Sequence, residues 1–146
     1  FDEVQQYAKN SKIQCLQLCG NIEMEISKIH DECDKKDFLE LYNLQEPGLH
    51  KLIRLSYQQL GLMTFFTAGE QEIRAWTILQ HTYAPQAAGT IHSDFERGFI
   101  KAEIYHISDL IQFESENSLR NNGKIRQEGK DYLVQDGDII FFKFNV

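Results

Sequence analysis

The sequence has little of what marks secreted, membrane or disordered proteins. Its 146 residues include only two prolines, and 42% of them are apolar, which is the composition of a folded soluble protein. No run approaches the roughly eighteen apolar residues of a membrane span, and the first residues have neither the basic nor the apolar region of a signal peptide. The length suits a single domain. Because there is no initiator Met, we expect a piece of a longer protein.

Cysteine and positive charge are also scarce. The three cysteines lie within the first 33 residues, and an odd number favours a reducing compartment, by default the cytoplasm. The net charge is −7, with seven basic against ten acidic residues over 1–61 and eight against twelve over 62–146. Neither part has the basic excess of a non-specific nucleic-acid binder. We therefore expect no DNA or membrane partner, and only local contact with any RNA.

The chain lacks a phosphate-binding loop. A Walker A motif reads Gly-x-x-x-x-Gly-Lys-Ser/Thr, so that backbone N–H groups surround the phosphates and the hydroxyl holds Mg²⁺. The two Gly-Lys pairs, Gly123-Lys124 and Gly129-Lys130, are followed by Ile and Asp. The sequence therefore predicts no site for the phosphates of ATP or GTP.

Catalytic and metal-binding patterns are weak as well. His92, Ser93 and Asp94 are the residue types of a hydrolase triad, but a triad converges from separated positions and neighbours cannot align that way. Three thiols and one imidazole are of the types that bind zinc: Cys15, Cys19, His30 and Cys33. If residues 13–19 form a strand, the first two lie roughly 13 Å apart, too far to share one ion at about 2.3 Å. We expect buried thiols, no metal and no catalytic residue.

The first 61 residues are typical of the end of an α/β domain. Residues 2–10 favour a helix, and residues 12–19 favour a buried strand that ends at Gly20. Asn21 is the expected cap of a helix with Ile22, Ile26 and Ile29 on one face, followed by a charged segment over 31–37. A short helix at 38–42 and a longer one that opens at Pro47 and runs to Leu60 complete this part.

From Leu62 the pattern is that of strands. A hairpin is expected over 62–67 and 72–79 around Gly69-Glu70, then helical residues over 84–98 and a strand over 99–105 with Ile100, Ala102 and Ile104 on one face. Helical turns at 108–113 and 118–122, a small hairpin of 124–126 with 132–134, and a last strand at 139–144 follow. On that strand one face holds Ile140, Phe142, Phe144 and Val146. This order predicts an α+β fold of the β-grasp, or ubiquitin-like, type over 62–146, preceded by 1–61.

Several polar and aromatic residues have a structural interpretation when taken alone. Ser93 and Asp94 are good N-caps for residues 95–97, and Gly98 is suited to ending that turn. Turn chemistry explains Asp136 and Asp138 on either side of Gly137 better than acid–base catalysis does. The aromatic residues at strand spacing are expected in the core rather than stacked on bases: Trp76 and the phenylalanines at 65, 66, 141, 142 and 144.

Five segments together resemble one known family. They read FFTAG, EIRAWT, AAGTIHSDFERGFIKAE, GKDY and DGD, and begin at residues 65, 72, 87, 129 and 136. In this order they are similar to the C-terminal part of the YchF, or Obg-like ATPase, family of P-loop NTPases. The resemblance covers essentially the whole chain and is most specific over 62–146.

The resemblance implies a protein of three parts: a nucleotide-binding domain, a coiled-coil insertion and a C-terminal TGS domain of β-grasp fold. Residues 62–146 resemble the TGS domain, and 1–61 resemble the last strand and helices of the α/β nucleotide domain. Cys19, Gly20 and Asn21 are similar to the loop beside the nucleotide base. The parent would bind ATP or GTP with Mg²⁺, hydrolyse it and associate with ribosomes, whereas this chain would bind no cofactor alone.

The implied role of residues 62–146 is recognition. TGS domains of stringent-response and threonyl-tRNA synthetases have similar Ile-His-x-Asp segments, which suggests docking on RNA, the ribosome or the parent's own nucleotide domain. The polar residues expected at such a surface are His92, Arg97, Lys101, Lys124, Arg126 and Lys130. The alternatives are a purely intramolecular regulatory domain without RNA contact and an independent enzyme; the second is disfavoured because nothing supplies a nucleophile beside His92.

We predict that purified residues 1–146 neither bind nor hydrolyse ATP, because the motif that surrounds the phosphates is missing. Isothermal titration with Mg²⁺-ATP should show no saturable heat, and phosphate release should equal the blank. Micromolar binding that depends on Mg²⁺ would contradict this prediction.

Overall fold

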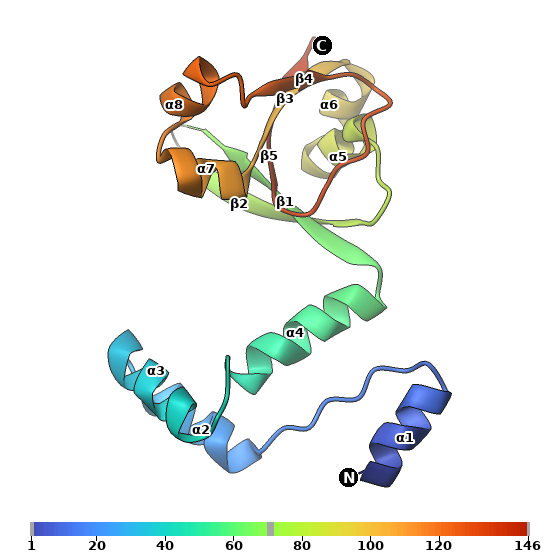
Figure 1. The fold of residues 1–146 in the computed structure, drawn as a ribbon. Coiled ribbons are helices and arrows are strands. Elements are labelled where there is room, and N and C mark those ends of the chain that lie inside the picture. The colour runs from blue at the N-terminus through green and yellow to red at the C-terminus, as the bar shows by residue number, and fades with distance from the viewer. Residues whose placement is uncertain (1, 70–71, 146) are drawn as a thin grey trace. The chain divides into compact units, whose positions relative to one another are not determined.

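The chain divides into two compact units, Phe1–Leu60 and Gly61–Val146. The computed structural model describes residues 2–69 and 72–145, so the expected turn at Glu70 and the place of Val146 on its strand lie outside the described residues. The first unit is helical, and the second contains the sheet (Figure 1). No helix within the described ranges is long and apolar enough to cross a membrane.

Four helices make up the described part of the first unit: α1 (Asp2–Asn10), α2 (Gly20–Lys28), α3 (Glu32–Leu41) and α4 (Gly48–Gln59). Helix α3 includes most of the charged segment and most of the short helix expected at 38–42. It begins in the charged segment because Asp31 caps it there, accepting from the N–H groups of Cys33 and Asp34. Helix α4 opens after Pro47 as predicted. The predicted cap Asn21 is wrong, because α2 begins at Gly20 and Asn21 lies inside the helix. Cys19 occupies the cap position.

The strand expected over residues 12–19 does not form. The backbone is extended at Cys19, with φ −106° and ψ 104°, but residues 13–19 pair with no strand among the described residues. A strand needs a neighbour for its N–H and C=O groups, and extended sequence preference alone does not supply one. The buried thiols predicted on this strand are also wrong, because Cys15 is half-buried and Cys19 is exposed.

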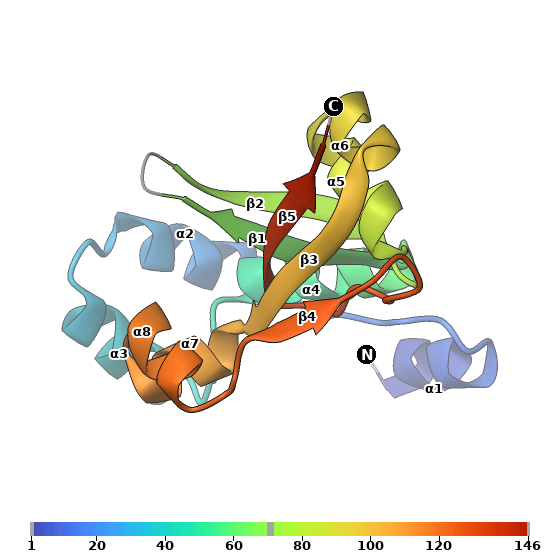
Figure 2. The same ribbon diagram turned by 90° about the horizontal axis from the view of Figure 1, so that it is seen from above.

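The second unit is built on one mixed sheet of five strands in the order β2-β1-β5-β3-β4. The strands are β1 (Leu62–Ala68), β2 (Ile73–Leu79), β3 (Phe99–His106), β4 (Arg126–Glu128) and β5 (Asp138–Phe144). The predicted β1–β2 hairpin is confirmed. Strand β5 runs parallel to β1 and antiparallel to β3, at the centre of the sheet (Figure 2). The expected combination of helices and strands is confirmed: this unit has helices and one open, mixed sheet.

Two predicted details of the sheet are wrong. Residues 124–126 and 132–134 do not pair with each other: β4 extends the free edge of β3, whereas Leu133 forms only an isolated bridge with Tyr83. The second error is Ile100, which is 56% exposed instead of facing the core. The register of β3 against β5 shifts between Phe99 and Lys101, and this shift turns Phe99 inward in its place.

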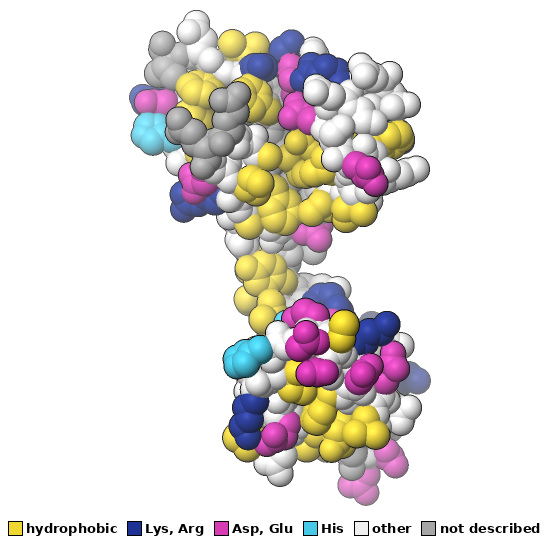
Figure 3. Space-filling view, turned by 90° about the vertical axis from the view of Figure 1, so that its left-hand side faces the viewer, with side chains coloured by type: hydrophobic (Ala, Val, Ile, Leu, Met, Phe, Trp, Pro, Cys, Tyr) yellow, Lys and Arg dark blue, Asp and Glu magenta, His cyan; other side chains and the backbone are white. Residues whose placement is uncertain are grey.

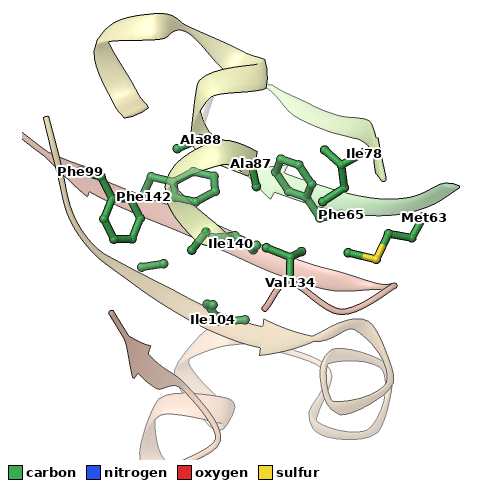
Figure 4. Packing of buried hydrophobic residues seen from close by; sticks show 12 residues of the cluster. Met63, Phe65, Ile78, Ala87, Ala88, Phe99, Ile104, Val134, Ile140 and Phe142 are labelled. Carbon is green, nitrogen blue, oxygen red and sulfur yellow. The ribbon is translucent and has the colours of Figure 1, made fainter. Parts of the chain in front are cut away.

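The main core lies between the sheet and helix α5 (Ala84–Ile91), which is followed by α6 (Ser93–Arg97). Three alanines of α5 have no exposed area, and their small side chains let the helix approach the strands closely. Figure 4 shows Phe65, Ile140 and Phe142 packed beneath it. Phe65 and Phe142 meet edge to face, with ring centroids 6.0 Å apart. Both were expected in the core, and this is confirmed.

The opposite face of the sheet is only partly covered. Helices α7 (Ile107–Phe113) and α8 (Glu116–Asn121) pack there, with Leu119 against Tyr105 and Ile139. Successive side chains of a strand point to opposite faces, so β5 contributes Ile140 to one core and Ile139 to the other. Beyond the two helices the face stays open: Ile73 is 78% exposed and Phe141 is 51% exposed.

Replacing Gly98 with Ala tests why glycine ends α6. Its φ is −91°, so no left-handed turn requires it. The backbone of Asn145 donates to the Gly98 carbonyl at 2.9 Å, and a Cβ at residue 98 would overlap the carbonyl of Asn145. We expect Gly98→Ala to lower the free energy of unfolding by about 1–3 kcal/mol, measured by urea denaturation. Gly129→Ala is the control because open space surrounds that position; equal losses in both variants would contradict this explanation.

Candidate functional site

A cavity of about 470 Å³ opens in the first unit, between the extended segment 16–19 and the start of α4. Its lining includes Cys19, one of the three residues expected beside a nucleotide base, together with Glu23 and Lys51. Gly20 and Asn21 form the first turn of α2. Of the three expected residues, only Cys19 lines this cavity, which is large enough for part of a small ligand.

The carboxylate of Glu23 fixes one wall of this cavity. Its two oxygens accept from the backbone N–H groups of Gly48 and Leu49, at 2.9 and 3.2 Å. A carboxylate at a helix N-terminus satisfies free N–H groups and favours the helix dipole, so Glu23 of α2 caps α4 from 25 residues away. Sequence reasoning missed this contact; the available signal was a helix that opens at Pro47-Gly48 with no capping side chain of its own.

An ion pair fixes the neighbouring wall. Arg54 of α4 donates to both carboxylate oxygens of Glu46, in the loop before the helix. The hydrogen bonds from Arg54, followed by its charge, lower the pKa of Glu46 below its usual range. Arg54 is exposed and Glu46 is half-buried, so the pair orients the loop more than it stabilises the fold.

In the second unit, His92 joins α5 to α6. It ends the first helix and caps the second, with Nδ1 accepting from the N–H of Asp94 at 3.2 Å. The predicted caps Ser93 and Asp94 are wrong, because both residues already lie in the first turn of α6. Asp94 instead accepts from Arg97, and its other oxygen lies 3.5 Å from His92 Nδ1. His92 and Arg97 stay accessible, with side chains 61% and 75% exposed.

An aromatic cavity lies next to this turn. The His92 ring is 6.3 Å from that of Phe95, which stacks on Phe144 at 3.8 Å. With Trp76 on β2, the two phenylalanines line a hollow of about 440 Å³. Trp76 is half-buried, and its indole N–H donates to Thr67 at 2.9 Å. The predicted core position is therefore wrong for Phe141 and Phe144, which are 51% and 38% exposed.

The other expected basic residues do not share one surface. Lys101 on β3 donates to the side-chain amide of Gln127 on β4, at 2.9 Å. Lys124 lies 3.4 Å from the carboxylate of Asp109 on α7, and Lys130 is exposed in the loop after β4. Arg126 on β4 lies near Tyr132, Glu128 and Asp138. Because Lys124 and Arg126 already have acidic partners and Lys101 is bonded to Gln127, the four residues form no continuous surface of free cations for a polyanion.

A buried carboxylate begins β5. Asp138 has no exposed area; its Oδ2 accepts from the hydroxyl of Tyr132 at 2.8 Å and from the N–H of Gln135 at 2.9 Å. Its Oδ1 has no hydrogen-bond partner among the residues described, and the nearest guanidinium nitrogen of Arg126 is 4.0 Å away. Asp136 accepts from the N–H of Thr64 at 2.8 Å. Asp138 therefore serves the turn, as predicted, and also holds the segment before β5 to the sheet, whereas the carboxylate of Asp136 ties the turn to β1.

The comparisons with known proteins agree with this arrangement. A family described as "YchF-GTPase_C: Protein of unknown function (DUF933)" matches residues 62–145. The chain belongs to the YchF family. The same YchF assignment extends over the first unit, because a solved structure described as the Schizosaccharomyces pombe YchF GTPase covers 97% of the chain, with a TM-score of 0.82 and 33% sequence identity. The chain covers 38% of that YchF structure.

Curated YchF relatives align with the chain from end to end. The proteins named "Ribosome-binding ATPase YchF" from Haemophilus ducreyi and Escherichia coli O157:H7 are 49% and 44% identical over 146 residues. The Bacillus subtilis protein of that name is 49% identical over 144 residues. The chain spans 39–40% of the length of these three proteins. It is thus similar to their C-terminal part, as predicted from the sequence.

The pH dependence of stability tests the Tyr132–Asp138 contact. Burial, then the hydrogen bond to Asp138, raises the pKa of Tyr132 from its ordinary value near 10 to about 12. Folding therefore favours the protonated phenol: its contribution is complete below pH 10 and is lost as the pH rises toward 12. Tyr132→Phe should lower the free energy of unfolding by about 1–2 kcal/mol at neutral pH.

Denaturation curves of the wild type and Tyr132→Phe at several pH values provide the measurement. The difference between the two proteins should be constant up to about pH 10 and shrink above it. Tyr83→Phe is a suitable control because the Tyr83 side chain is more exposed. A difference that grows above pH 10 would contradict the proposed contact.

Proposed function

We propose that this chain is the C-terminal, ribosome-docking part of an ATP-hydrolysing YchF protein of the cytoplasm. The observation that carries the proposal is the alignment of the whole chain with proteins named ribosome-binding ATPases, of which it spans about 40%. The chain has no phosphate-binding loop of its own. In this proposal the nucleotide chemistry belongs to the remaining part of such a protein, and this chain supplies recognition.

Residues 62–146 are proposed to be a TGS module of β-grasp fold. A hairpin of β1 and β2, a parallel pair of β1 and β5, and helix α5 across one face support this assignment. The segment from His92 to Arg97 presents its polar side chains at the end of α5. That turn, beside the cavity lined by Trp76 and Phe95, is the best placed of the polar groups expected from the sequence.

Residues 1–61 are proposed to complete the nucleotide domain of the intact protein. Cys19, Gly20 and Asn21 would lie near the base of bound ATP or GTP, and the Mg²⁺ and phosphates would be held by residues outside this chain. The cavity beside Cys19 supports this role because Glu23 and the Arg54–Glu46 pair give it ordered walls.

An intramolecular regulatory role is the second candidate. One observation favours it: Glu23, two residues after the expected base loop, caps α4, and α4 is the last element before β1. A change of conformation at residues 19–21 would therefore act on the N-terminus of the helix that precedes the second unit. Under this alternative the second unit would respond to nucleotide without touching RNA or ribosome.

Co-sedimentation of residues 1–146 with purified ribosomes, titrated with salt, tests the proposal. We expect saturable binding. The logarithm of the binding constant should fall only shallowly with the logarithm of the salt concentration, because residues 62–146 contain twelve acidic and only eight basic residues. Each RNA phosphate contact would add about 0.7–0.9 to that slope. Absence of binding would contradict ribosome docking. In the intact protein, Arg97→Glu should weaken ribosome binding and leave ATP turnover unchanged; the reverse result would favour the intramolecular role.

A further inference from the structure

The open part of the sheet forms a groove of about 610 Å³ beside α8. Its apolar lining comes from β1, β2, β3 and β5 and includes Ala68, Ile73, Tyr105, Ile139 and Phe141. Charged side chains stand around it, and Figure 3 shows hydrophobic side chains exposed among charged ones on the second unit. An apolar surface that is left open and rimmed by charge is typical of an interaction site.

One end of this groove is lined by Lys143, and Lys101 lies opposite Lys143 on the neighbouring strand. Lys101 on β3 pairs in register with Lys143 on β5, and alternation places both side chains on the open face, in line with Glu103 and Phe141. Side chains directly opposite on antiparallel strands start about 5 Å apart, and like charges in that position repel. The fold therefore keeps an unfavourable pair where a single acidic residue would be more stable.

Neutral groups hold both ammonium groups. Lys101 donates to Gln127, and the Lys143 ammonium lies 4.3 Å from the centre of the Phe141 ring. Among the described residues, no carboxylate lies within 4.0 Å of either lysine. The nearby acids are already engaged, because Glu103 and Glu116 both face Arg120, at 4.0 and 3.4 Å. Charge complementarity at this end of the groove thus calls for an added anion.

We propose that this groove binds a protein segment in which a carboxylate adjoins apolar side chains. The carboxylate lies between Lys101 and Lys143, and the apolar side chains cover Phe141 and Ile73. This inference rests on the proposed ribosome docking and deepens it, because it assigns the contact to an acidic segment of a ribosomal protein. The groove's aliphatic floor suits such a segment, since the centre of a protein interface is apolar and poor in charge.

Single-stranded RNA fits the same groove less well. An RNA strand needs cations that follow its backbone and open aromatic faces for its bases. Among the described residues that line the groove, the cations are Arg120 and Lys143, which stand beside the acidic Glu103 and Glu116. Lys143 already lies over the Phe141 ring. The eight basic and twelve acidic residues of 62–146 add a repulsive background for a polyanion.

Charge reversal in residues 1–146 tests the lysine pair. Lys143→Glu should raise the thermal midpoint, because it replaces a repulsive cross-strand pair with an attractive one. The double variant Lys101→Glu with Lys143→Glu should bind purified ribosomes about tenfold more weakly, as two attractive contacts become repulsive. Lys9→Glu with Lys36→Glu makes the same change of charge on two exposed residues of the first unit and should leave binding unchanged.

A photo-crosslinking residue in place of Phe141 identifies the occupant. After illumination with ribosomes, we expect one crosslinked ribosomal protein, at a peptide that contains Asp or Glu beside apolar residues. The synthetic peptide should compete with ribosomes, and its Asn or Gln version should compete about tenfold less well. A crosslink that ribonuclease removes would assign the groove to RNA and overturn the inference. Equal ribosome binding by the double lysine variant and the wild type would also overturn the groove inference, but it would leave the proposed ribosome docking intact. If the wild type did not bind ribosomes, both the groove inference and the proposed docking would be overturned.

Discussion

Strand β5 is the constraint on which the second unit depends, because it is paired on both sides and contributes side chains to both hydrophobic cores. It runs parallel to β1 and antiparallel to β3, and its neighbours Ile139 and Ile140 lie in the two separate cores. A parallel pair cannot be closed by a tight turn, so the chain between β1 and β5 must supply the covering helices. Asp138, held by Tyr132, fixes where this central strand begins.

The same alternation along β5 separates stability from recognition. Ile140 and Phe142 point to the α5 core, whereas Phe141 and Lys143 point to the open face next to Lys101. Side chains outside the core can change without loss of stability, and these are the side chains available for contact with a partner. Lys101 and Lys143, which lie opposite each other without a carboxylate partner among the described residues, indicate that this face has another role.

Sequence patterns predicted the elements that are stabilised locally and missed those decided by distant partners. Helix α4 and the β1–β2 hairpin follow from periodicity and turn residues. The strand expected at 12–19 does not form because a β-ladder needs a second strand. Leu133 pairs with Tyr83 instead of β4, which is likewise decided by a distant partner. At the candidate site, exposed His92 and Arg97 were foreseen, but Lys143 was not, because strand register alone places it beside Lys101.

Hydrogen exchange of residues 1–146, measured with and without purified ribosomes, tests the central claim that the second unit is the docking part. The account predicts that ribosomes slow exchange in the second unit, most clearly in residues 139–143 of β5 and their neighbours on β3, and leave α2 and α4 unchanged. Protection confined to the first unit, or no protection anywhere, would contradict it.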